Sequence, residues 1–113
     1  MNLLNKVENV LAKFRAHKQI MGNLEVKKSQ DCYPEQYDIL CYGIYTGYIR
    51  LRYGVVSICF SPAGAKEYTT TVLYSEKVGN KHVNEFTSNS KRKEIIYKAK
   101  KLISECIYFD MMS

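Results

Sequence analysis

A cluster of basic residues at the predicted start of the last helix is the feature of this chain most suggestive of chemistry. Residues 88–90, Ser-Asn-Ser, can cap a helix and lead directly into Lys91, Arg92 and Lys93. A helix N-terminus carries about half a positive charge, so each basic side chain in the first turn costs about 0.3–1 kcal/mol unless an anion lies beside it. A phosphate group is one anion that such helix ends bind.

The cluster therefore predicts a nucleic-acid-binding site, which Lys98 and Lys101 extend along the helix. The alternative is a lysine-rich helix face that only faces solvent.

A second candidate site lies in the predicted strand 48–53. Side chains alternate between the faces of a strand, so this segment has one aromatic and basic face and one apolar face. The first face comprises Tyr48, Arg50 and Arg52, and the second Ile49, Leu51 and Tyr53. Aromatic rings stack on bases while guanidinium groups bind phosphates, so the strand predicts a platform for single-stranded nucleic acid. A solvated sheet face is again the alternative.

Two helices are predicted to flank the strands that carry this platform. From Asn2 to Met21 apolar residues recur at helical spacing, and Gly22-Asn23 ends the pattern. Lys13, Arg15 and Lys18 lie in its second half, where the helix dipole favours positive charge. The last helix is predicted from Lys91 to Tyr108, with one apolar face. Both are amphipathic, so each requires an apolar surface to pack against.

The segment between the helices predicts an antiparallel β-meander. A short strand is expected at Leu24–Lys28, and Ile, Val, Tyr and Cys are abundant from residue 37 to residue 60. Gly43 and Gly54 fit either turns or bulges. The strands expected from residue 37 onward are Asp38–Ile44, Tyr48–Tyr53, Val55–Phe60, Tyr68–Tyr74 and His82–Thr87, with a loop at Ser61–Lys66 and a hairpin turn at 78–81. The predicted fold class is α+β, with a meander of about four to five strands and the C-terminal helix packed on one sheet face.

Composition limits the size, the location and the partners of the protein. A chain of 113 residues with 46% hydrophobic content predicts a single domain, 1–113. The formal net charge of +6 favours nucleic acid, an anionic membrane surface or an acidic protein as partner. The four cysteines have no metal-ligand spacing and the start is polar, so we expect reduced, mostly buried thiols in a cytoplasmic protein. No apolar stretch reaches the length of a membrane span.

The C-terminal part of the chain resembles the C-terminal half of a double-stranded RNA-binding domain. The resemblance runs through the strand Tyr68–Tyr74, the turn at Gly79-Asn80, the strand His82–Thr87 and a helix that opens Ser-Lys-Arg-Lys at residue 90. It implies that Lys91, Arg92 and Lys93 contact phosphates across a major groove. The chain departs from the family in having Ile95, Ile96 and Tyr97 in place of small alanines, and in the extra strands before residue 60.

The sequence predicts neither an enzyme nor a cofactor or metal site. His17 and His82 lie in different predicted elements, and no HExxH, His-x-His or paired CxxC pattern occurs. For Cys59 and His82, a buried thiol and a surface imidazole are favoured over a nucleophilic pair. We therefore expect a binding protein.

Two classes of function remain after these exclusions. The first is association with DNA, RNA or a nucleoprotein complex through the residues above. The second is a protein-binding inhibitor of a host enzyme or defence complex, of the kind made by phages and mobile elements. Ten tyrosines and the apolar tail 108–112 favour the second class, unless the tail packs on the core. A homodimer through an edge strand or the tail is also compatible with the sequence.

The position of the charge distinguishes these two classes. A continuous basic surface around Arg50 and Lys91 would favour nucleic acid. Scattered charge around a patch of tyrosine and methionine would favour a protein partner.

Overall fold

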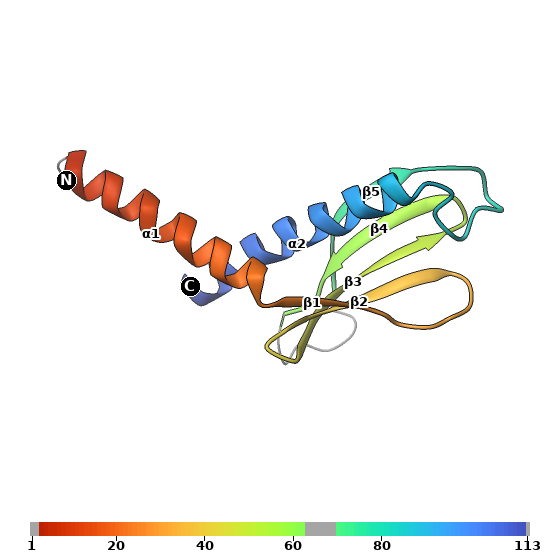
Figure 1. Ribbon diagram of the computed structural model, residues 1–113, viewed down its shortest axis with the longest axis horizontal. Coiled ribbons are helices and arrows are strands. Elements are labelled where there is room, and N and C mark those ends of the chain that lie inside the picture. The colour runs from red at the N-terminus through yellow and green to blue at the C-terminus, as the bar shows by residue number, and fades with distance from the viewer. Residues whose placement is uncertain (1–2, 63–69, 113) are drawn as a thin grey trace.

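The computed structural model describes residues 3–62 and 70–112, and it has the predicted α+β architecture (Figure 1). Along the chain the elements are α1 (Leu3–Gly22), β1 (Leu24–Lys28), β2 (Glu35–Cys41), β3 (Ile44–Arg52), β4 (Val55–Phe60), β5 (Thr71–Lys77) and α2 (Asn89–Met112). The five strands form one antiparallel sheet in the order β1-β2-β3-β4-β5. Of the expected loop Ser61–Lys66, and of the expected strand Tyr68–Tyr74, residues 63–69 lie outside the described residues.

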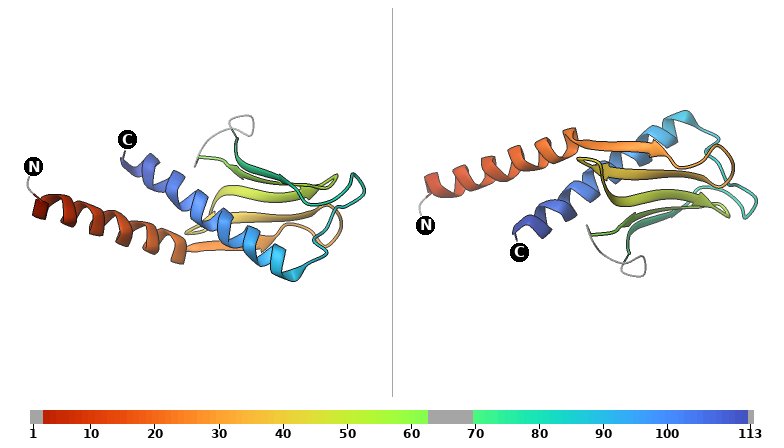
Figure 2. Two further views of the ribbon diagram at one scale, coloured as in Figure 1. Left: turned by 90° about the horizontal axis from the view of Figure 1, so that it is seen from above. Right: turned by 90° about the horizontal axis from the view of Figure 1, so that it is seen from below.

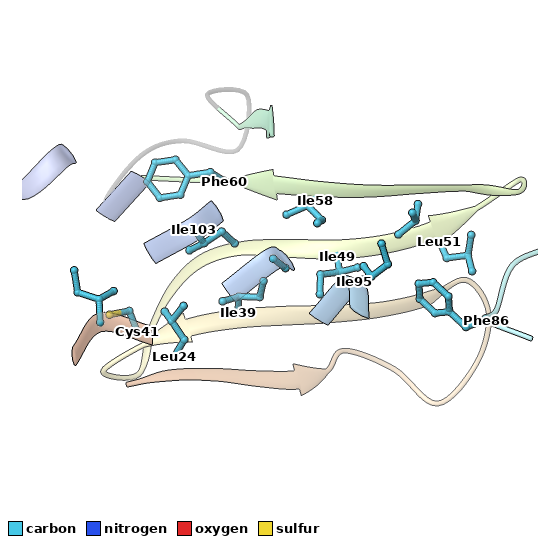
Figure 3. Close-up of a cluster of buried hydrophobic side chains, with 13 residues drawn as sticks. Leu24, Ile39, Cys41, Ile49, Leu51, Ile58, Phe60, Phe86, Ile95 and Ile103 are labelled. Carbon is cyan, nitrogen blue, oxygen red and sulfur yellow. The ribbon is translucent and has the colours of Figure 1, made fainter. Parts of the chain in front are cut away.

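The core lies between one face of this sheet and α2 (Figure 3). Ile49 and Leu51 of β3 are fully buried there, as the alternation of the strand predicts. From α2, Ile95, Ala99 and Ile103 pack against them and are likewise fully buried. These three residues recur every four positions, which keeps one helix stripe on the sheet. The opposite face of the sheet is not covered by a helix (Figure 2).

Gly43 and Gly54 form turns rather than bulges. The β2–β3 and β3–β4 hairpins each have a two-residue loop, Tyr42-Gly43 and Tyr53-Gly54, in which both residues have positive φ. This is the type I′ geometry that matches the twist of a hairpin. The prediction that Tyr53 belongs to the apolar face of a strand is therefore wrong, because the turn places Tyr53 at the surface with 60% of it exposed.

Residues 82–87 were expected to form a strand, and that expectation is wrong. β5 continues to Lys77, opposite Val55 at the start of β4, and the following segment crosses the β3–β4 turn. There the N–H of Gly54 donates to the carbonyl of Val83 at 2.7 Å, and the N–H of Tyr53 donates to Oδ1 of Asn84 at 3.0 Å. Hydrogen bonds with asparagine side chains and with the turn backbone thus hold this segment in place without β-strand pairing.

The two helices differ in how much of their length is packed. α2 crosses the covered face of the sheet, whereas α1 projects beyond the sheet and contacts the C-terminal part of α2 (Figures 1 and 2). α1 ends as predicted, with Nδ2 of Asn23 donating to the carbonyl of Gln19 at 2.8 Å. Neither α1 nor α2, over the residues described, is long and apolar enough to cross a membrane.

Candidate binding surfaces

The guanidinium group of Arg92 is paired inside the protein with a carboxylate. Its Nε donates to Oε2 of Glu35 at 2.7 Å, and its Nη2 donates to Oε1 at 3.1 Å. Glu35 begins β2 and is only 5% exposed, so this two-pronged bond joins the start of α2 to the sheet. Two further donors, the Tyr37 hydroxyl and the N–H of Phe86, complete the surroundings of the carboxylate.

These contacts fix Glu35 in its charged form. Burial by itself raises the pKa of Glu35, but the hydrogen bonds from Arg92, Tyr37 and Phe86, together with the charge of Arg92, lower that pKa to about 2. Burial and the neighbouring carboxylate raise the pKa of Tyr37 to about 12. The anion expected at the start of the helix is thus present, and it belongs to the protein itself.

Lys91 also pairs with a carboxylate, on the edge strand β5. Its Nζ lies 2.7 Å from Oε2 of Glu76 in β5 and 3.2 Å from Oε2 of Glu94. The hydrogen bond with Lys91 lowers the pKa of Glu76 and raises that of Lys91. Two turns further along α2, Nζ of Lys98 lies 4.0 Å from the centre of the Tyr74 ring. Both lysines therefore tie α2 to β5.

Only two of the predicted basic residues on α2 remain without such contacts. Lys93 and Lys101 are exposed, and neither has an ion-pair partner among the described residues. They lie eight positions apart on the helix, so they do not form a dense basic surface. The helix start is capped as predicted, with the N–H of Lys91 donating to Oγ of Ser88 at 3.2 Å.

The second predicted cluster lies on the uncovered face of the sheet. Because Ile49 and Leu51 point into the core, Tyr48, Arg50 and Arg52 point away from α2. The guanidinium of Arg50 lies 4.9 Å from the Tyr48 ring centre, and its Nε donates to Gln36 at 2.9 Å. Arg52 lies over the Tyr53 ring and donates to its hydroxyl at 3.0 Å. Within the described chain neither arginine pairs with a carboxylate.

Tyr45 belongs to this open face and was missed by the sequence prediction. It pairs with Leu40 beside the bulge at Ile39/Leu40, and 43% of it is exposed. Burial, then the charge of Asp38, raises the pKa of Tyr45 to about 12. The bulge puts Tyr45 on the same face as Tyr48 despite their odd spacing, and no pattern in the sequence indicates it.

The two predicted clusters therefore do not form one continuous basic surface. Arg50 and Arg52 lie on the open face of the sheet, whereas Lys91 and Arg92 lie on α2 across the opposite face, in contact with carboxylates. Charge is scattered over the protein.

A surface feature that the sequence did not predict is apolar and helical. Four apolar side chains of α1 are 47–67% exposed, although the sequence predicts only that they share one face of an amphipathic helix. Beside them the end of α2 exposes Phe109, and a groove of about 450 Å³ between the helices is lined by Val10, Phe14, His17 and Phe109 among others. We call the set the helical surface: Val7, Val10, Leu11, Phe14 and Phe109.

The tail predicted at 108–112 forms the last turns of α2. Tyr108 packs edge-on against His17 with ring centres 4.9 Å apart, whereas Phe109, Met111 and Met112 are 59–71% exposed. The tail thus both contacts α1 and adds to the exposed apolar surface.

Among the described residues, potential metal ligands do not cluster and the cysteines are unpaired. The described part of the chain contains no cluster of three or more His, Cys, Asp or Glu side chains that could hold a metal ion. Cys41 and Cys59 are buried, Cys106 is half-buried, Cys32 is exposed, and all four are free thiols.

Fold and surfaces together define an α+β protein with an antiparallel meander, one covered and one open sheet face, and a projecting N-terminal helix. Comparison with models of known families, with curated proteins and with solved structures gives no match.

Proposed function

We propose that this protein is a non-catalytic binding protein that holds another protein through the helical surface. The observation that carries the proposal is the exposure of large apolar side chains on one helix, 67% for Val10 and 65% for Phe14. Monomeric proteins rarely expose contiguous apolar patches larger than a few hundred Å², and larger patches are typical of interaction sites. The separation of Arg50 from Lys91 and the pairing of Lys91 and Arg92 with carboxylates also favour a protein over nucleic acid as the main partner.

Affinity capture with matched variants tests this proposal. Phe14→Glu places a charge in the helical surface, and Tyr97→Glu is its control, because Tyr97 is also a helical aromatic residue, 63% exposed, on α2. Each tagged protein is incubated with a lysate of its source cells, with and without nuclease treatment, and any captured protein is purified and titrated calorimetrically. We expect a direct complex that Phe14→Glu weakens on the order of 30-fold, as for an interface hot spot, and Tyr97→Glu leaves unchanged.

Two results would contradict the proposal. One is a complex that both variants form equally, which would exclude the helical surface. The other is capture that disappears when nucleic acid is digested, which would make the protein a nucleic-acid binder.

A second function, binding of single-stranded nucleic acid to the open sheet face, is supported by Arg50 and Arg52. Both guanidinium groups lie beside tyrosine rings and lack a carboxylate partner among the described residues, so their charge is available to phosphates. Fluorescence anisotropy with short DNA and RNA strands over a salt series measures this binding.

The matched variants for this second function are Arg50→Glu/Arg52→Glu and Lys93→Glu/Lys101→Glu, which change the net charge equally on opposite faces of the sheet. Loss of binding in the first alone would support the open face. Equal loss in both would indicate nonspecific attraction to the basic chain.

A further inference from the structure

The apolar stripe of α1 continues beyond the helix that covers it. Val7, Val10, Phe14, His17 and Met21 alternate in spacing between three and four residues, the pattern by which one helix packs along another. His17 contacts Tyr108 of α2 and Met21 is half-buried, whereas Val7, Val10 and Phe14 are 47–67% exposed. The exposed half of the stripe thus has the geometry of a helix-packing seam.

Burial of this half supplies only part of the free energy that a stable complex requires. Val7, Val10 and Phe14 are 47–67% exposed, so a partner removes only that share of their apolar area from water. Association has a cost of its own, because the two molecules lose translational and rotational freedom and side chains at the interface become ordered. Favourable charge contacts at the rim of the seam are therefore needed in addition.

The α1 side of the seam is basic, whereas α2 contributes one carboxylate, Glu105, to the lining of the groove. Between residues 6 and 18, α1 carries Lys6, Lys13, Arg15 and Lys18 but only one carboxylate, Glu8. Nζ of Lys13 lies 5.4 Å from the centre of the Phe109 ring, at the groove between the two helices. A second copy of α1 would bring this positive charge against itself, which disfavours self-association. A flat membrane surface would not fill the groove between α1 and α2.

We propose that the helical surface binds an acidic amphipathic helix of a partner protein, which extends the packing of α2 along α1. This inference rests on the proposed function and adds the chemistry of the partner. Apolar residues of the partner helix lie on Val7, Val10 and Phe14, and its carboxylates lie beside Lys6 and Lys13. The end of α2 at Phe109 forms the other wall of the site.

Two fluorescein-labelled peptides of about four heptads test the proposal, both with leucine at the core positions, one with glutamate and the other with lysine at the flanking positions. With the full chain, we expect the glutamate peptide to bind at least about tenfold more tightly than the lysine peptide, and more weakly as salt rises. Phe14→Glu should weaken binding of the glutamate peptide on the order of 30-fold, and Tyr97→Glu should not.

Charge reversal provides the second arm of the test. Lys6→Glu/Lys13→Glu should reverse the preference toward the lysine peptide, whereas Lys93→Glu/Lys101→Glu, with the same change of net charge on α2, should keep the preference for glutamate. Circular dichroism of each variant checks that the fold is retained.

Several results would overturn the inference. Equal binding of the two peptides, or no binding, would refute the acidic helix, while the proposed function would still stand if Phe14→Glu disrupts the captured complex. A dimer in analytical ultracentrifugation that Phe14→Glu dissociates would make a second copy the occupant. Tighter binding to vesicles of phosphatidylserine and phosphatidylcholine than to the glutamate peptide would make the occupant a membrane.

Discussion

Replacement of Arg92 by methionine distinguishes a structural from a phosphate-binding role for the start of α2. Methionine keeps most of the side-chain volume and removes the charge, so the 5% exposed carboxylate of Glu35 loses its partner at 2.7 and 3.1 Å. Breaking a buried pair from one side typically costs about 3–5 kcal/mol. The hydrogen bonds from Tyr37 and Phe86 to Glu35 remain, which reduces this cost.

The pKa of Glu35 gives a second way to work out how much stability Arg92→Met loses. Unfolding returns the pKa of Glu35 from about 2 to its ordinary value of 4.5. At about 1.4 kcal/mol per pH unit, this change in pKa corresponds to about 3 kcal/mol of folding stability at neutral pH. Arg92 shares this effect with Tyr37 and Phe86. We therefore expect Arg92→Met to lower the free energy of unfolding by about 2–3 kcal/mol at pH 7.

The same pair predicts how stability depends on pH. The folded pKa of Glu35 lies below the unfolded one, so the unfolded chain binds the proton more readily, and this contribution is lost as pH falls from about 5 toward 2. The difference in free energy of unfolding between the wild type and Arg92→Met should therefore become smaller as pH falls from about 5 toward 2.

Urea unfolding followed by circular dichroism at pH 7 and pH 3 measures both effects, with Lys93→Met as the control because Lys93 lies in the same turn and is exposed. Stability of Arg92→Met within about 0.5 kcal/mol of the wild type at pH 7 would refute the reasoning, because that is the usual effect of a surface substitution.

Three further perturbations test the fold that positions the surfaces. Gly54→Ala should cost at least about 2 kcal/mol in urea unfolding, because φ is +78° and an added Cβ would lie 2.2 Å from the carbonyl oxygen of Asn80; wild-type stability would contradict the turn. Ser88→Ala should cost about 1 kcal/mol through loss of the cap on the N–H of Lys91, and a helix of unchanged stability would mean another residue caps it. In thiol labelling with a chromogenic disulfide, exposed Cys32 should react first and Cys59, 2% exposed, only after unfolding; the opposite order would contradict their burial.

Local patterns were sufficient to predict most of the fold. The strand Val55–Phe60 has the predicted bounds, and both helices begin and end within four residues of their predicted limits because periodicity and end signals agree there. The strand expected at Asp38–Ile44 is instead Glu35–Cys41, since Tyr42-Gly43 forms the hairpin turn. At 82–87, turn chemistry from Asn80 and Asn84 prevailed over β-propensity.

The candidate surfaces could be predicted only in part, because they depend on tertiary contacts. That the start of the helix requires an anion follows from the sequence and the dipole. That the anion is Glu35, 57 residues away, does not, because no local pattern joins the two. Similarly, the apolar face of α1 is visible in the sequence, but its exposure is not, because it depends on how α1 projects beyond the sheet and leaves Val7 and Val10 exposed.

Part of the positive charge of the protein is paired with its own carboxylates and does not indicate a ligand. Lys91 and Arg92 connect α2 to the two sides of the sheet through Glu76 and Glu35, so their charge serves stability rather than a ligand. Besides Lys93 and Lys101 on α2, positive charge without an ion-pair partner among the described residues lies on two surfaces, the open sheet face and α1. Because these two surfaces share no residue, Arg50→Glu/Arg52→Glu and Phe14→Glu should affect different ligands independently. A single ligand lost with both variants would require one partner that spans the two surfaces, and that result would contradict both proposals as stated.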